Sequence, residues 1–179
     1  MTETGAPPRV VIIIAAALAA ALAAVVAVFG LLASSDGEQP THTGPLPLVT
    51  VPAPQAGSSQ CTSLVQAAPA ELESGGALLL RRVLAEPAPP ATVAWGNGDP
   101  VVLRCGLETP RELTPMTPLR QINGVSWLEV PGEGAATWYA VDRAVFVALT
   151  VPADAGTGPL QQISDTVDGT LPPVPVRFK

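Results

Sequence analysis

Few side chains in this chain of 179 residues suit nucleophilic or metal chemistry. The sequence contains two cysteines, Cys61 and Cys105, and a single histidine, His42, which lies in a proline-rich stretch. We interpret His42 as an incidental surface residue. With no histidine elsewhere, the usual Ser-His-Asp and Cys-His nucleophile arrangements cannot form, and no C-x-x-C pair indicates a zinc site. The sequence therefore predicts no catalytic residue, no metal ligand and no cofactor site.

Carboxylates are the remaining candidates for catalysis. A glycoside hydrolase needs two acidic side chains that flank the bond it cleaves. Such a pair requires only that two acids of the folded region meet, and the candidates are Glu108, Glu112, Glu129, Asp142 and Asp99. Because the chain has a net charge of −6, acids that meet by chance on its surface are the more common case. A carboxylate-dependent cell-wall hydrolase or lyase therefore stays an alternative to a protein without enzymatic activity.

Aromatic side chains are rare, at 4% of the residues, so each one matters. Trp95 and Trp127, together with Arg104, are candidates for a surface platform that binds a sugar or a peptide; Trp138 and Tyr139 are further aromatic candidates. Large aromatic residues on strands of an aromatic-poor domain more often anchor the core. Arg104 is expected either to be buried with an acidic partner or to face water.

An uncharged block near the N-terminus organises the chain. As a helix, residues 10–33 would span roughly 36 Å, against a hydrocarbon thickness of about 30 Å. Arg9 precedes this block, so the positive-inside rule places residues 1–9 in the cytoplasm and the remainder outside. We therefore predict a single-pass signal-anchor helix in the cell membrane. Cleavage at Ala33-Ser34-Ser35, which would release a secreted protein, is the alternative.

The composition changes twice after this block. Residues 34–59 are rich in Pro, Thr, Gly and Ser, and their prolines exclude a helix or a central strand, which predicts an extended tether. Residues 60–179 are predicted to form one extracytoplasmic α+β domain. The domain is expected to begin with a short helix that Ser59 caps and that carries Cys61. A second helix is expected from Gly158.

Strand pairs are predicted for the centre of the domain. Three hairpins are expected, at residues 92–106, 119–130 and 137–151, and the Asn123-Gly124 turn is the strongest of their signals. Alternating apolar residues over 145–151 predict a strand with one buried face. We expect an antiparallel sheet of about five to seven strands, packed by one or two helices. Residues 78–83 fit either a strand or a helical turn.

Both cysteines follow the predicted membrane segment and so lie on its oxidising side. This location makes a disulfide between Cys61 and Cys105 the default interpretation. It would join the first helix to the central strand. Closing a loop of about 45 residues would stabilise the fold by up to about 4 kcal/mol in the loop-entropy model.

Four segments in this order resemble a known family: Ala94-Trp95-Gly96, Leu103-Arg104-Cys105-Gly106, Asn123-Gly124-Val125-Ser126-Trp127, and the strand at 145–152. They are similar to an uncharacterised family of actinobacterial membrane-anchored envelope proteins that carry a domain of unknown function. The resemblance covers residues 61–171. It implies export and an N-terminal membrane segment. Because the family has no established activity, the resemblance supplies no catalytic residues.

These observations predict a membrane-anchored, extracytoplasmic binding or accessory protein of the cell envelope without enzymatic activity. Its expected partners are the membrane, through the N-terminal helix, and an envelope protein. The net charge of −6 argues against binding to the phosphate backbone of nucleic acids. The alternatives are the carboxylate-dependent hydrolase or lyase and a secreted lipid- or sugar-binding protein.

Overall fold

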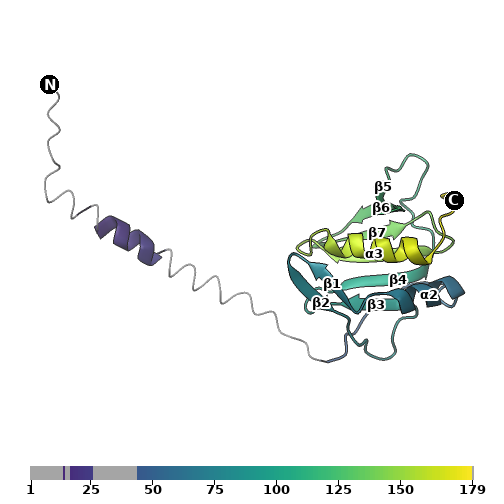
Figure 1. Ribbon diagram of the computed structural model, residues 1–179, viewed down its shortest axis with the longest axis horizontal. Helices are drawn as coiled ribbons and strands as arrows, with labels where there is room; N and C mark the ends of the chain where they lie inside the picture. Colours follow the sequence, from purple (N-terminus) through teal and green to yellow (C-terminus); the bar gives the residue numbers. More distant parts are fainter. Residues whose placement is uncertain (1–13, 15–16, 26–43, 179) are drawn as a thin grey trace, which may run out of the picture. The chain divides into compact units, whose positions relative to one another are not determined.

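A computed structural model describes residues 14, 17–25 and 44–178 of the chain (Figure 1). The chain divides into two compact units, Met1–Pro40 and Thr41–Lys179. In the first unit, residues 14 and 17–25 are helical with exposed side chains. Over the described ranges, no helix is long and apolar enough to cross a membrane. More than half of the predicted membrane segment, 10–33, lies outside the described residues, as do the N-terminal residues 1–9 and much of the predicted tether.

The second unit is an α+β fold with antiparallel sheets, as predicted. Its six-stranded sheet has the order β3-β4-β8-β7-β6-β5, and β1 and β2 form a separate two-stranded sheet. The strands are β1 (Glu71–Ser74), β2 (Ala77–Leu80), β3 (Thr92–Trp95), β4 (Val101–Leu107), β5 (Arg120–Ile122), β6 (Val125–Pro131), β7 (Ala135–Ala140) and β8 (Phe146–Pro152). The three predicted hairpins are confirmed as β3–β4, β5–β6 and β7–β8. The ambiguous stretch at 78–83 begins as a strand, β2.

Two helices, α2 (Ser59–Ala67) and α3 (Gly158–Thr170), cover one face of the six-stranded sheet (Figure 1). Their apolar side chains pack with the inward residues of the strands into the main core, which contains Cys61, Leu64, Val93, Leu103, Cys105, Val147, Leu149, Ile163 and Val167. The predicted disulfide between Cys61 and Cys105 is present, with 5.4 Å between the Cα atoms. It joins α2 to β4, the second strand from one edge of the six-stranded sheet. The helix is capped by the Ser58 hydroxyl, which accepts the Cys61 N–H, and not by Ser59 as expected.

The opposite face of the sheet is also packed. Phe146 and Ala148 of β8 are buried there, in a second cluster with Leu107, Leu113, Leu128 and Val141. The prediction that β8 has a single buried face was therefore wrong. The alternation of apolar residues in the sequence identified only the face of β8 that points toward the helices. Irregular segments of the chain cover the other face. They contribute Leu119 from the 108–119 loop, Val51 and Ala53 from the segment before α2, and Val176 from the C-terminal tail.

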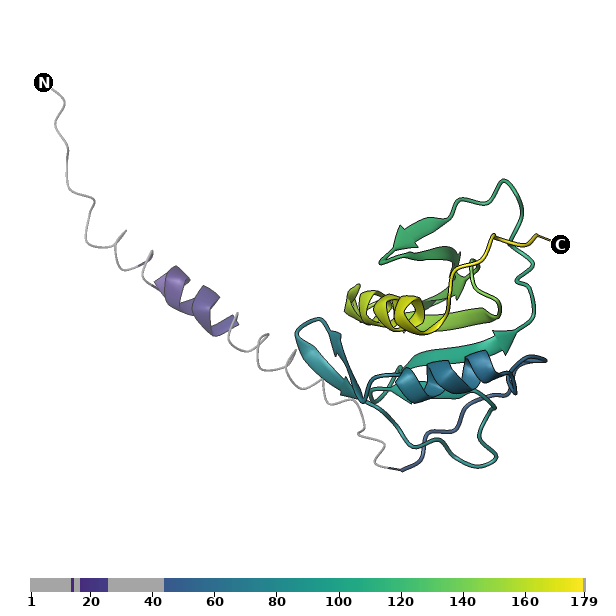
Figure 2. The ribbon, with the colours of Figure 1, turned by 45° about the vertical axis from the view of Figure 1, so that its right-hand side comes forward.

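The described residues of that segment before α2, 44–58, lie against the domain, and we call them the strap (Figure 2). The Leu46 N–H donates to the Val83 carbonyl at 2.8 Å, and the Gln55 N–H donates to the Gly106 carbonyl at 3.0 Å. The folded part thus begins about fifteen residues before the expected start near Ser59. Prolines do exclude a helix here, but the residues between them keep N–H groups that can bond to the domain.

Gly106 is the point where the strap comes closest to the sheet. Its φ of +84° lies in the left-handed region, at the register shift that separates the Cys105 and Leu107 pairings of β4 with β8. A Cβ at this position would overlap the backbone of Gln55 and Ala56. Glycine is therefore required here both by the backbone conformation and by the approach of the strap.

Candidate functional site

The two tryptophans proposed for a surface platform are in the core. Trp95 and Trp127 are both 0% exposed. Their indole N–H groups are satisfied internally, since Trp95 Nε1 donates to the Pro69 carbonyl and Trp127 Nε1 to the Ser164 hydroxyl, each at 2.9 Å. The platform interpretation was therefore wrong for both residues, because their strands turn these side chains toward the helices. They are core anchors, the other interpretation that the sequence allowed.

The remaining two aromatic candidates, Trp138 and Tyr139, are partly exposed on opposite faces of β7. On the helix side, the Arg120 guanidinium carbon lies 5.8 Å from the Trp138 ring centre. Arg120 Nε also lies 3.1 Å from the Glu129 carboxylate. On the helix side, the Arg120 guanidinium is therefore already engaged by the Glu129 carboxylate and the Trp138 ring.

A second cluster of charges is buried at the turn between β7 and β8. The Arg143 side chain is 0% exposed and lies 2.9 Å from a carboxylate oxygen of Asp142 and 2.9 Å from one of Asp168. Asp142 also accepts the Ser126 N–H at 2.9 Å. Arg143 further donates to the Gly124 carbonyl, so it ties the β5–β6 turn to the end of α3. The sequence placed Asp142 and Arg143 in a turn but provided no signal for their burial.

The five acids weighed for catalysis are thus dispersed. Asp142 is held by Arg143, and Glu129 by Arg120. Asp99 lines a groove near Arg104, while Glu108 and Glu112 line a different pocket. Across the ranges that the structure describes, no group of three or more His, Cys, Asp or Glu side chains could hold a metal ion.

Arg104 belongs to the sheet face opposite the helices, and its position follows from the strand register. Arg104 of β4 pairs with Ala148 of β8, which pairs with Tyr139 of β7. Neighbouring strands are about 4.8 Å apart, so the two long side chains start about 10 Å apart with only a methyl group between them. In the next row, the hydroxyl groups of Thr137 and Thr150 are 3.2 Å apart.

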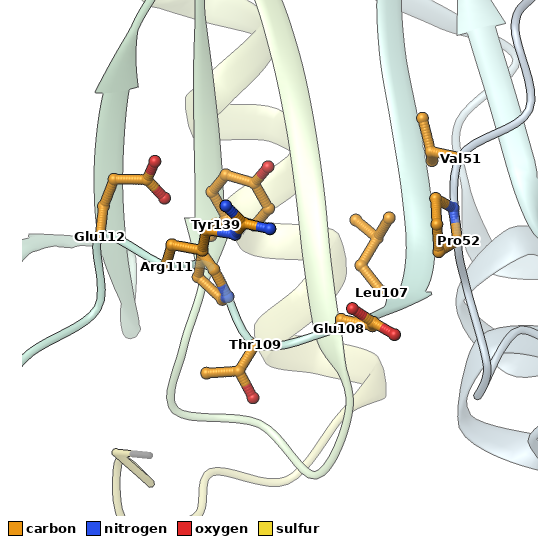
Figure 3. A pocket seen from close by; sticks show the side chains of 9 residues that line it. Val51, Pro52, Leu107, Glu108, Thr109, Arg111, Glu112 and Tyr139 are labelled. Atoms are coloured by element: carbon orange, nitrogen blue, oxygen red, sulfur yellow. The ribbon is translucent and has the colours of Figure 1, made fainter.

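Two hollows flank this row. One, of about 260 Å³, is lined by Tyr139, by the strap residues Val51 and Pro52, and by part of the 108–119 loop. Figure 3 shows the Arg111 and Glu112 side chains beside Tyr139, and Leu107 across from Val51 and Pro52. The other, of about 350 Å³, is lined by Arg104 and Thr150 and by the exposed acids, Asp99 and Glu133. We call the row and its two hollows the open sheet face.

Arg104 is half-buried on this face without a matching acid. No carboxylate lies within ion-pair distance of it over the described part of the chain. Its Nε is buried without a hydrogen-bond partner, and its Nη2 has only a long contact, 3.5 Å, with the Val49 carbonyl of the strap. Burial lowers the pKa of the Arg104 guanidinium from its ordinary value. Arg104 is therefore neither paired with an acid nor simply solvated, the two states that the sequence suggested.

Tyr139 shares this environment. Burial raises the pKa of its phenol above 10, the nearby Glu112 carboxylate raises it further, and the Arg104 charge opposes both. At neutral pH the phenol is therefore protonated and remains a hydrogen-bond donor. The open sheet face thus offers a cationic fork of N–H donors from Arg104 and, about 10 Å away across the buried Ala148, the hydroxyl donor of Tyr139. Such a set suits the binding of a negatively charged oxygen group.

The fold and this face define a small disulfide-stabilised α+β domain with one face of its sheet only partly covered. The chain belongs to a family of proteins of unknown function, DUF3515, whose family model matches residues 16–176. The resemblance to an uncharacterised domain family is thereby confirmed, whereas its actinobacterial and envelope character stay predictions. Neither the curated proteins nor the solved structures contain a match to this chain.

Proposed function

We propose that this protein is a membrane-anchored, extracytoplasmic binding or accessory protein of the cell envelope that engages a partner protein through the open sheet face, without catalysis. The observation that carries the proposal is the half-buried Arg104, which has no acidic partner among the described residues. A partly desolvated charge without a counter-charge reduces the stability of the isolated domain. A partner that supplies the missing acceptor restores this stability. The state of Arg104 therefore supports a role in recognising a partner and not in holding the fold together.

The extracytoplasmic location rests on separate support. The Cys61–Cys105 disulfide suits an oxidising compartment. The uncharged block at 10–33 is long enough for a membrane anchor, and Arg9 before it favours a cytoplasmic N-terminus. Residues 44–58, which the sequence assigned to the tether, are bound to the domain and belong to the folded unit.

The shape of the face favours a polypeptide over a small molecule. Its two hollows, about 260 and 350 Å³, lie at or below the low end of the range for small-molecule pockets. They flank one row of side chains and do not enclose a cavity. A protein surface that covers the row can fill both hollows with side chains and surround Arg104 with a rim that excludes water.

A carboxylate-dependent hydrolase is the second candidate, because Glu108 and Glu112 line the same pocket. Figure 3 shows their carboxyl groups well apart, on opposite sides of Tyr139, which disfavours a pair acting on one bond. Release of soluble fragments from wall glycan by the purified protein, lost in Glu108→Gln and Glu112→Gln, would establish this candidate in place of the binding protein.

Site-specific photo-crosslinking of the full-length chain in native membranes tests the proposal. A photoreactive residue at Glu133, an exposed position in the hollow beside Arg104, should capture a reproducible envelope protein. The same residue at Gln66, exposed on α2, is the matched control and should not capture it. Equal capture at both positions, or none at Glu133, would contradict the proposal.

The same sample tests the anchor. Mass spectrometry of the membrane fraction should recover the intact N-terminal peptide that contains Arg9. A chain that begins at Ser34 or Ser35 in the soluble fraction would instead establish the secreted alternative.

A further inference from the structure

We propose that Arg104 is the recognition residue for an oxyanion, a carboxylate or phosphate group, that binds at the open sheet face. The inference rests on the proposed binding function and names the chemistry of the group that the partner contributes. The first argument is the state of the guanidinium edge formed by Nε and Nη2. The buried Nε has no acceptor, and the acceptor of Nη2, the Val49 carbonyl, is at the 3.5 Å limit.

This edge has the geometry that planar and tetrahedral oxyanions require. Two parallel N–H groups on one side of a guanidinium bind two oxygen atoms of a carboxylate or phosphate at once. An oxyanion that binds here replaces the long contact between Nη2 and Val49 and provides the acceptor that Nε lacks. Because Val49 belongs to the strap and not to the sheet, the strap can yield at this point while the strands that hold Arg104 keep their register.

Three other arginines of the domain provide a comparison. A fourth, the exposed Arg81, also has no carboxylate among the described residues, but it donates to two carbonyls at 3.3 and 3.4 Å. Arg143 is held by two carboxylates, and Arg120 by Glu129 and the Trp138 ring. Arg177 donates to the Ala144 carbonyl at 2.7 Å. Arg104 is at least as buried as Arg120, yet over the described residues it has no carboxylate and only the long carbonyl contact. Its environment therefore differs from that of an arginine whose role is to hold the fold together.

The surroundings of Arg104 decide how selective such a site is. Thr150 lines the same hollow as Arg104, and Tyr139 lies on the same sheet face, across the buried Ala148 from Arg104. Asp99 and Glu133 line the same hollow and repel an incoming anion. Both acids are exposed, so their repulsion is weakened by solvent. We therefore expect weak binding of small free anions and tighter binding when a partner surface covers the acids.

Nuclear magnetic resonance of the full-length chain in neutral detergent micelles tests the site directly. The protein is labelled with ¹⁵N-arginine, and the Nε–H signal of Arg104 is followed while sodium acetate or inorganic phosphate is added at constant ionic strength. Acetate represents a carboxylate and phosphate represents a phosphoryl group, so the two titrations show which oxyanion the site prefers. We expect a saturable shift of the Arg104 signal with at least one of them. A shift equal to that produced by sodium chloride would overturn the inference.

Four substitutions give the expected pattern. Arg104→Gln should weaken oxyanion binding by at least about tenfold, measured through the Tyr139 ring signals. Arg104→Lys keeps the charge but loses the fork, and should also weaken it. Arg81→Gln removes the same charge from an exposed position in a hollow outside the open sheet face and should change binding by less than about threefold. Glu133→Gln should tighten it by about two- to threefold. Equal losses in the Arg104 and Arg81 variants would refute a specific site.

The two proposals fail separately. Capture of a partner at Glu133 that persists in Arg104→Gln, with no oxyanion binding, would leave the binding function standing and remove the oxyanion site. Saturable binding at Arg104 without any captured protein would leave the oxyanion site standing and remove the partner protein.

Discussion

Substitution of Gly106 by alanine tests whether the strap is an integral part of the domain. An alanine at φ +84° adopts a left-handed conformation that costs about 1–2 kcal/mol for a residue with a Cβ. The added Cβ would also lie 2.7 Å from the Cα of Ala56 and overlap the adjoining backbone atoms. Because the opposing atoms are backbone, no side-chain rotation can relieve this overlap, and the strap has to move.

The cost of moving the strap follows from its contacts. The hydrogen bond from the Gln55 N–H to the Gly106 carbonyl contributes about 1 kcal/mol. Val51 and Ala53 are partly buried in the second cluster, and their exposure costs about 1 kcal/mol or more. We therefore expect Gly106→Ala to lower the free energy of unfolding by about 3–5 kcal/mol, a large share of the 5–15 kcal/mol that is usual for a domain.

Urea unfolding followed by tryptophan fluorescence measures the global effect, because Trp95 and Trp127 are buried in the core. Hydrogen exchange at the Gln55 amide reports the strap itself. Gly57→Ala is the matched control, since an alanine there meets no atom within 4 Å and Gly57 has no positive φ. It should change stability by no more than about 0.5–1 kcal/mol. An unchanged unfolding midpoint and an unchanged Gln55 protection in Gly106→Ala would refute the close approach described here.

Three further predictions concern the turn, the disulfide and the tyrosine. Gly124→Ala should destabilise the domain by about 2–4 kcal/mol in urea unfolding, because φ is +79° and the new Cβ would lie 2.7 Å from Asp168 Oδ1; a neutral effect would argue against this packing. Reduction of the disulfide should lower stability by up to about 4 kcal/mol, measured by unfolding with and without reductant, and no loss would contradict its structural role. Tyr139, the one tyrosine in the chain, should ionise above pH 10 in an absorbance titration, and Glu112→Gln should lower its midpoint. The unfolded chain loses this proton at a lower pH than the folded domain does. The stability that the raised pKa contributes is therefore fully present below about pH 10 and is lost as pH rises through the pKa of Tyr139 in the folded domain. A midpoint at or below 10 would refute the burial of the phenol.

The features of the fold that were predicted correctly depend on residue types, on their spacing over short stretches of sequence and on the number of cysteines. Asn123 and Gly124 both adopt positive φ, at +44° and +79°, as a two-residue hairpin turn requires. Alternation along β4 correctly separated Leu103 and Cys105 from Arg104. The disulfide followed from having only two cysteines and a predicted oxidising compartment.

The parts that were missed depend on contacts between distant segments. The strap looks like a free tether because its composition excludes a helix but does not show what it packs against. Arg143 looks like a solvated turn residue, since its second acid, Asp168, is 25 residues away. The partial exposure of Trp138 and the burial of Trp127 likewise depend on where α3 lies across the strands, which no local pattern encodes.

The candidate site was found only in part. Sequence reasoning singled out Arg104, and alternation placed it on the face away from the cysteines. Its lack of an acidic partner depends on the whole fold, and so does its alignment with Tyr139 across Ala148. The rows of a sheet are set by register, which a two-residue turn fixes within one hairpin but not between β4 and β8.

The strap and the disulfide together determine how the domain responds to mechanical load. A pull on the N-terminal side reaches the strap first and breaks its hydrogen bonds one after another, at Leu46 and then at Gln55. Between residue 44 and Cys61 the freed chain can lengthen to about 55–60 Å. The covalent bond to Cys105 then transfers the tension to β4 and bypasses most of α2 and the whole of β1, β2 and β3. Under tension the strap therefore detaches and extends first, up to the length at which the disulfide takes the load. The segment that detaches includes Val49, whose carbonyl accepts the long hydrogen bond from Arg104.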